Sequence, residues 1–399
     1  MRTVRIYATI EFTYNLARSC FHAVYGVFLA ERGLSVEQIT LLRIIFFAVI
    51  VVCELPTGML ADKIGRILAT KLSVVFCAAG YAAYFFGADY YGFVSAVLLT
   101  GIGFALHSGS LEAWAVDALH REDPNYPLEQ LFSKGKQAET QGMIVGALGG
   151  AIIAAVYMNG IWLLGLTGML ATLGIMMATV SEPTQTSEPI PFPSPAQLRR
   201  GVIHGLPFVA LLLVSMAYFF FNQPTFLYWQ IYFKDLLHLT TREGGWDVNQ
   251  PILGVIYFLM HQSVSLGAWL APRLPGSPSA RLIGGGILMG LPFLVCGFTS
   301  SVWVIGPMFF VSYVSRGVFE PMFRALSNRQ IRPQHRASVI SLITMVSRVG
   351  SILALVALGP VAARSLGQSF AIAALVFVVC LPGLMLLHRQ LLMEETHER

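Results

Sequence analysis

The sequence predicts an all-α polytopic membrane protein with twelve transmembrane helices in two pseudo-symmetric six-helix bundles. Three observations predict this fold class. Hydrophobic residues make up 55% of the 399 residues and charged residues only 12%, about half of the ~25% that is usual in soluble domains. The apolar residues form long continuous runs, whereas β-barrel strands alternate. A proline-rich segment separates the runs into two sets of six.

So few charged residues cannot cover a water-soluble surface. The composition therefore excludes a soluble enzyme, a disordered chain and a nucleic-acid binder, and it predicts the lipid bilayer as the protein's surroundings. The five cysteines all fall inside apolar runs and show neither metal-ligand spacing nor a disulfide framework. We expect no metal site.

Each expected span has the ~20 mostly apolar residues that a bilayer requires. Six lie in an N-terminal half at residues 1–180 and six in a C-terminal half at 201–399. Residues 181–200 contain five prolines and are typical of a stiff, extended linker. The spans are expected at residues 6–30, 36–60, 68–88, 92–119, 137–158, 160–180, 203–234, 249–271, 280–298, 301–325, 337–361 and 366–388.

Most of the 26 Lys and Arg residues fall on one side of the predicted spans. Because cytoplasmic loops carry the excess of Lys and Arg, both termini and the linker are expected to be cytoplasmic, in an inner or plasma membrane. The halves also resemble each other: Gly109–Glu112 and Gly317–Glu320 end corresponding spans. In membranes such a duplication points to a transporter built from repeats.

The loop after the second span carries the most specific motif. It reads Gly58-Met-Leu-Ala-Asp62-Lys63-Ile-Gly65-Arg66, followed by Lys71. This run resembles the signature loop of the major facilitator superfamily, and the twelve spans and the central linker extend the resemblance over nearly the whole chain. It implies the major facilitator fold, with a polar cavity between two bundles and alternating access by rocking.

The resemblance also implies a cytoplasmic gate made of Gly58, Asp62, Gly65, Arg66 and Asp117. Asp62 would sit against the start of the eleventh span, near residues 337–338, and Arg66 would meet Asp117 at the end of the fourth. Both contacts are expected to cross moving parts and to hold the cytoplasmic side shut. The alternative is a solvated turn whose charges only set topology.

Ionisable side chains inside the spans are functional candidates, because each costs about 3 kcal/mol or more unless it is paired or hydrated. Several form polar stripes at helical spacing, such as Glu11, Asn15 and Arg18. Arg18 and Arg348 lie near mid-bilayer, where they could clamp an anion; alternatively they form permanent ion pairs, Arg18 with Glu11 for example. The substrate-cavity candidates are Asn15, Arg18, His107, Asn222, Gln223, Trp229, Arg316 and Arg348.

Proton coupling needs a group that loses and regains a proton as access alternates, and a buried carboxylate suits this role. Glu11 and Glu112 are the first candidates, with Glu320 next. Gly142–Gly150 partly resembles the glycine-rich signature of drug antiporters, although the proline is missing and the spacing is one residue short. Small residues at this spacing also pack helices closely.

The chain has no phosphate-binding loop of the type found in ATPases, and we predict neither an enzyme nor a cofactor. The sequence favours a secondary transporter, acting as a monomer on protons and a small molecule. Glu112–Asp117 and Arg336–Ser341 resemble runs of bacterial drug/proton antiporters, which favours efflux of amphipathic compounds. The alternatives are carriage of a specific anionic metabolite, or a non-transporting receptor or scaffold.

Overall fold

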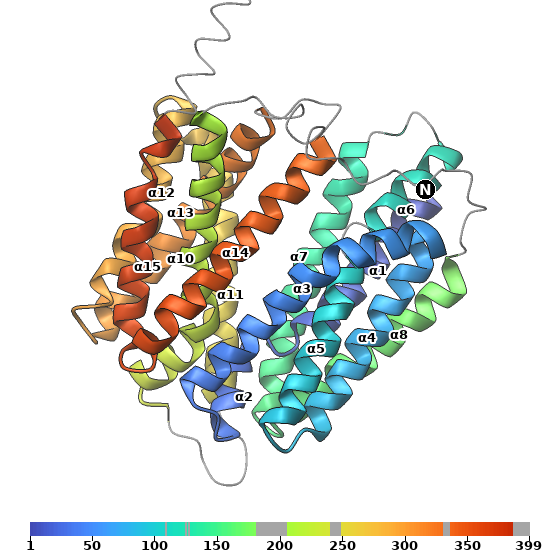
Figure 1. The fold of residues 1–399 in the computed structure, drawn as a ribbon, viewed down its shortest axis with the longest axis horizontal. Coiled ribbons are helices and arrows are strands. Elements are labelled where there is room, and N and C mark those ends of the chain that lie inside the picture. The colour runs from blue at the N-terminus through green and yellow to red at the C-terminus, as the bar shows by residue number, and fades with distance from the viewer. Residues whose placement is uncertain are drawn as a thin grey trace, which may run out of the picture. The chain divides into compact units, whose positions relative to one another are not determined.

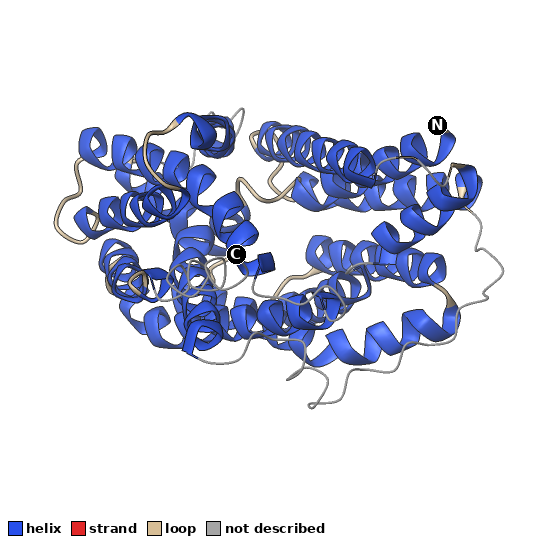
Figure 2. Ribbon diagram, turned by 90° about the horizontal axis from the view of Figure 1, so that it is seen from above, coloured by secondary structure: helices blue, strands red, loops and turns tan. Residues whose placement is uncertain are grey.

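The structure, a computed structural model, describes residues 1–107, 110–123, 126, 128–180, 206–239, 249–329 and 336–385. Within these ranges the chain is helical and contains no strand (Figures 1 and 2). The helices are α1 (Arg2–Ser19), α2 (Tyr25–Glu31), α3 (Val36–Ile64), α4 (Arg66–Phe86), α5 (Tyr90–His107), α6 (Ser110–Glu122), α7 (Leu128–Ala154), α8 (Gly160–Thr179), α10 (Leu206–Leu236), α11 (Asn249–Leu270), α12 (Pro278–Val295), α13 (Val302–Arg329), α14 (Arg336–Ala362) and α15 (Leu366–Cys380).

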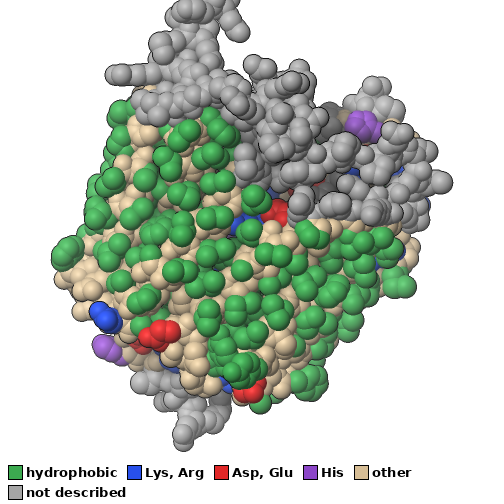
Figure 3. All heavy atoms as spheres, in the orientation of Figure 1, with side chains coloured by type: hydrophobic (Ala, Val, Ile, Leu, Met, Phe, Trp, Pro, Cys, Tyr) green, Lys and Arg blue, Asp and Glu red, His purple; other side chains and the backbone are tan. Residues whose placement is uncertain are grey.

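The all-α membrane fold is confirmed. In the described part of the chain, nine helices are long and apolar enough to cross a membrane. The other three predicted spans correspond to α1 with α2, to α7 and to α12, whose apolar part is shorter. Hydrophobic side chains cover most of the helical surface on the face drawn in Figure 3, as a lipid-facing surface requires.

One span that the sequence predicts as continuous is divided in the structure, because residues 6–30 form α1 and α2. Residues 92–119 lie in α5 and α6, on either side of residues 108–109, which are outside the described ranges. At the break between α1 and α2, His22 N donates to Ser19 O and Val24 N to Phe21 O, so tight turns replace the α-helical pattern. The prediction was wrong here because neither proline nor glycine marks the break.

Contacts between helices divide the chain into two compact units. Unit 1 comprises Met1–Leu34, Leu41–Ile190 and Leu239–Phe258, and unit 2 comprises Ser35–Thr40, Pro191–His238 and Leu259–Arg399. In unit 1, α1 packs on α7 and α8, α4 on α5 and α8, and α7 on α8. In unit 2, α10 packs on α14 and α15, α12 on α13 and α15, and α14 on α15. The same pattern of partners appears in each unit, as duplicated halves would produce.

The closest helix contact in unit 1 lies between α1 and α7, and three glycines of α7 make it possible. A Cβ atom on Gly142 would lie 2.3 Å from Phe12 O, on Gly146 2.2 Å from Leu16 O, and on Gly150 1.6 Å from Cys20 O. No side chain fits at these distances, so the two backbones touch along this stripe. The glycines thereby position the polar face of α1.

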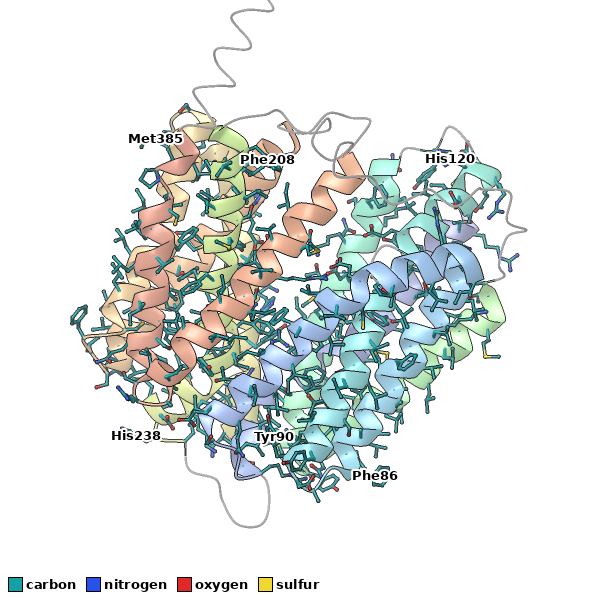
Figure 4. The ribbon with its side chains drawn as sticks, viewed as in Figure 1. Phe86, Tyr90, His120, Phe208, His238 and Met385 are labelled. Atoms are coloured by element: carbon teal, nitrogen blue, oxygen red, sulfur yellow. The ribbon has the colours of Figure 1, made fainter. Side chains whose placement is uncertain are left out.

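The start of α1 is held by Glu122, the last residue of α6, at the end of unit 1 that also carries His120; Phe86 and Tyr90 lie at the opposite end (Figure 4). The Glu122 carboxylate accepts hydrogen bonds from Arg2 N and Thr3 N, both at 2.9 Å. These N–H groups have no partner within the helix. Hydrogen bonds from the Thr3 side chain and from both backbone groups lower the pKa of Glu122 from 4.5 to about 2.

We expect this contact to make folding stability depend on pH between about 4.5 and 2. Since the folded state lowers the pKa, the contribution is fully present above the upper value and is lost as the pH falls towards the lower one. Glu122→Ala should therefore flatten the dependence of the unfolding temperature on pH in this range. If the unfolding temperature of the variant depends on pH as that of the wild type does, the Glu122 contact does not link stability to pH.

Candidate functional site

The polar face of α1 in unit 1 brings several predicted residues together. Glu11 is 8% exposed and Asn15 2%. Asn15 Nδ2 donates to the Glu11 carboxylate at Oε2, 3.0 Å away, and to Glu11 O, 2.9 Å away. Asn15 Oδ1 is buried and has no hydrogen-bond partner among the described residues. The amide therefore holds the carboxylate in place and keeps one acceptor unused.

Arg18 lies in the last turn of α1, directly before the break. Its guanidinium carbon sits 4.7 Å from the centroid of the Phe104 ring on α5, a cation–π contact. It forms no ion pair or hydrogen bond within the described ranges, so the permanent pair with Glu11 that the sequence allowed is not formed. The side chain is half-buried, and its five N–H donors are left available for a planar anionic group.

His107 ends α5 and stacks on Tyr14 of α1. The ring centroids are 3.9 Å apart and the ring planes 10° from parallel. His107 Nδ1 is buried without a hydrogen-bond partner, and Tyr14 itself is fully buried. The stacking fixes the histidine against the polar face of α1, next to the turn that contains Arg18.

Three carboxylates of unit 1 act on one another electrostatically. Glu139 of α7 and Glu112 of α6 both act on Glu11, and Arg18 opposes them. Glu112 is exposed in the first turn of α6. Glu139 Oε2 lies 2.8 Å from Lys136 Nζ. Glu139 was not predicted from the sequence, although it lies on the glycine stripe of α7, three residues before Gly142.

The expected contact between Arg66 and Asp117 is present in unit 1. Arg66 Nη1 lies 2.8 Å from Asp117 Oδ2, and the two side chains are 38% and 53% exposed. Gly65 precedes α4 with a φ of 99°, which glycine adopts readily. Both charged residues belong to unit 1, so the expectation that this pair crosses moving parts was wrong.

Other parts of the predicted gate lie outside the described residues. Gly58 and Asp62 are within α3, but the side chain of Asp62 is outside the description. The same holds for the side chains at 337–338 and for the linker at 181–200. The role of Asp62 stays a prediction.

In unit 2 the central feature is a pair on α13. Arg316 Nε lies 2.9 Å from Glu320 Oε1, and the two side chains are 29% and 24% exposed. The hydroxyl of Tyr218, on α10, donates to the same Glu320 oxygen. Asn222 Nδ2 donates to Tyr218 O at 2.7 Å. Three predicted candidates, Arg316, Glu320 and Asn222, are thus connected through Tyr218. Tyr218 was not predicted, although it lies one turn before Asn222.

The remaining candidates of unit 2 differ in burial. Gln223 is 7% exposed and its Oε1 has no hydrogen-bond partner. Trp229 is 2% exposed and packs near Phe233. Arg348 is half-buried on α14. Within the described ranges, no three His, Cys, Asp or Glu residues are placed to hold a metal ion.

Comparisons with known proteins agree with this arrangement of helices. The family model of the Major Facilitator Superfamily matches residues 8–355. No curated protein matches the chain.

Solved transporters share the fold. A mutant of the nucleoside transporter NupG superposes with a TM-score of 0.76 at 12% identity, covering 96% of this chain and 99% of that chain. A bacterial homologue of the human lysosomal transporter Spinster gives 0.74 at 15% identity, with 97% and 96% covered. The human organic anion transporter MFSD10 gives 0.63 at 17% identity, with 95% and 99% covered. At these identities the likeness shows the fold alone.

Proposed function

We propose, from the premise that this chain belongs to the Major Facilitator Superfamily, that it couples proton movement to the transport of a small organic anion by alternating access. The chain is a secondary transporter of a small molecule across a membrane, and its role is transport, not catalysis. The proposal concerns the substrate class, the coupling ion and the residues involved.

The observation that carries the anion assignment is the state of Arg18. A guanidinium within a membrane span costs about 3 kcal/mol unless it is paired or hydrated. Within the described ranges Arg18 lies over the face of Phe104 and acts electrostatically on Glu11, but it forms no ion pair. A carboxylate or phosphate can accept two parallel hydrogen bonds from such a group. Among the similar solved structures is one of an organic anion transporter.

The proton-coupling part rests on the carboxylates of unit 1. Glu11 is buried and hydrogen-bonded to Asn15, and Glu112 acts on it electrostatically. A carboxylate that lies near other carboxylates gains and loses a proton more easily than a carboxylate that is fixed in an ion pair. Glu320 differs, because Arg316 and Tyr218 hold its ionised form, so we place it after Glu11 and Glu112.

A second candidate function is proton-driven antiport that exports amphipathic cations. Glu112 favours it, because this exposed carboxylate on α6 forms no ion pair within the described ranges. In that case Glu112 would attract the cation, and Arg18 would have a supporting role.

We further propose that the protein acts as a monomer in an inner or plasma membrane, with both termini cytoplasmic. The bias of Lys and Arg supports this orientation. It places the Arg66–Asp117 pair at the cytoplasmic end of unit 1, where it would brace the gate residues Gly58, Asp62 and Gly65.

The test is flux through the purified protein in liposomes under an imposed pH gradient, with a series of radiolabelled small carboxylates and organic cations. We expect pH-driven flux of a carboxylate. Arg18→Ala should lower this flux about a hundredfold, since losing one partner of a desolvated charge pair costs a few kcal/mol. Glu112→Gln should lower proton coupling while the carboxylate still binds.

Arg364→Ala is the matched control, because Arg364 is exposed and should leave the flux unchanged. If cations move and Glu112→Gln is the more damaging substitution, the second candidate is correct. If neither class moves under any gradient, the chain is a scaffold or receptor, and both transport proposals are wrong.

A further inference from the structure

We propose that Glu139 of α7 passes protons between Glu11 and the water at the His120 end of unit 1. This inference rests on the proposed proton coupling and adds the residue that connects the buried carboxylate to solvent.

The packing of α1 on α7 places Glu139 at the level of Glu11. A Cβ atom on Gly135 would lie 2.3 Å from the ring of Tyr7, and one on Gly142 would lie 2.3 Å from Phe12 O. The contacts follow the same order along both helices, so the helices run parallel. Glu139 lies between these two glycines on α7, and Glu11 lies between Tyr7 and Phe12 on α1. The two glutamates are therefore at the same level along the paired helices.

Electrostatic interactions agree with this register. Among charged groups acting on Glu11, Glu139 has the largest effect, ahead of Glu112 and Arg18. Glu139 also acts on Tyr7 and on Glu112, and Lys136 acts on Glu112. The third helix that packs on α1, α8, carries no ionisable side chain. The ionisable groups that act on Glu11 are therefore Tyr7, Arg18, Glu112 and Glu139, and Lys136 acts on the last two of these.

Exposure rises stepwise along the proposed route. Glu11 is 8% exposed as a residue, whereas the side chains of Glu139 and Lys136 are 27% and 64% exposed. Lys136 Nζ binds Glu139 Oε2 at 2.8 Å, at the boundary between the helices and water. Because Lys136 is far more exposed than Arg316, water screens this pair and it holds the ionised form less firmly than the Arg316–Glu320 pair does. Of Glu11 and Glu139, Glu139 is thus the carboxylate that solvent can reach.

The Asn15 side chain can hydrogen-bond Glu11 in both of its protonation states. The Asn15 amide is held against the Glu11 carboxylate through Nδ2, and its Oδ1 is buried without a partner. A neutral Glu11 gains an O–H group, which needs an acceptor. Asn15 Oδ1 supplies one after rotation of the amide. In the transfer itself, a hydronium ion protonates the Glu139 carboxylate and becomes water, the proton then passes from Glu139 to the Glu11 carboxylate, and no electrons change hands.

The experiment follows the infrared band of the protonated Glu11 carboxyl in the full-length protein in liposomes. Glu11→Gln identifies the band by removing it. A light pulse that releases acid from a caged compound then lowers the pH. We expect Glu139→Gln to slow the growth of the Glu11 band tenfold or more, because a positioned proton-transfer group contributes about 10²-fold or more to the rate. Its final height should stay the same.

Glu139→Asp keeps a carboxylate at the position and should restore most of the rate. Asp89→Asn removes an exposed carboxylate directly before Tyr90, which Figure 4 labels at the opposite end of unit 1, and should behave as the wild type. If Glu139→Gln leaves the rate unchanged while Glu11 still titrates, the relay is wrong and the proposed coupling survives. If no Glu11 band forms between about pH 5 and 9, the relay and Glu11 coupling are both wrong.

Discussion

Replacing Gly150 with alanine should destabilise unit 1 by about 3 kcal/mol, the upper end of the usual cost of overpacking. The added methyl group would lie 1.6 Å from Cys20 O and 2.5 Å from Cys20 C. Both are backbone atoms beside the break between α1 and α2, so no side-chain rotation relieves the clash. The helices would have to separate along the whole stripe of Gly142, Gly146 and Gly150.

Gly149 provides a matched control one residue away. A Cβ atom there meets nothing within 4 Å, and alanine is about 1 kcal/mol better than glycine within a helix. Thermal unfolding of the detergent-solubilised protein should therefore show a large loss for Gly150→Ala and no loss for Gly149→Ala. If the two substitutions change the unfolding temperature equally, α1 and α7 do not pack as closely as these distances require.

Replacing Glu320 with leucine should destabilise unit 2 by about 2 kcal/mol. Loss of one partner from a buried ion pair costs roughly 3–5 kcal/mol, and the partial exposure of Arg316 and Glu320 reduces this figure. The substitution leaves the Arg316 guanidinium without its carboxylate and the Tyr218 hydroxyl without its acceptor. Thermal unfolding at neutral pH is the measurement.

The double variant Arg316→Met with Glu320→Leu separates structure from function at this pair. It removes the unpaired charge, so it should recover much of the stability that the single variant loses. Recovery of stability together with normal pH-driven flux would assign the pair to the structure of unit 2. If Glu320→Leu alone is as stable as the wild type, the Arg316–Glu320 pair contributes nothing to the stability of unit 2.

The fold could be predicted from the sequence because the bilayer imposes a length and a composition that continuous apolar runs reveal directly. The division of α1 from α2 could not. Residues 20–24 contain neither proline nor glycine, and the break depends on packing between distant helices. Cys20 Sγ donates to Ile161 O, and the Phe21 ring lies 4.9 Å from Trp162.

The candidate site was predictable to the extent that its contacts are local. Helical spacing placed Glu11, Asn15 and Arg18 on one face, and the four-residue interval of Arg316 and Glu320 matches their ion pair. Contacts with distant partners were beyond such reasoning. Phe104 under Arg18 and Tyr218 beside Glu320 come from other helices, and only the packed unit brings them close.

Binding to Arg18 is the central claim, and one measurement tests it directly. Wild-type protein and Arg18→Met, which keeps an apolar stem beside Phe104, are unfolded thermally with matched series of small carboxylates, amines and neutral amphiphiles. A ligand that binds the folded state raises the unfolding temperature. We predict that certain carboxylates stabilise the wild type and lose this effect entirely in Arg18→Met. Stabilisation by carboxylates to the same degree in both proteins, or by amines alone, would contradict the account.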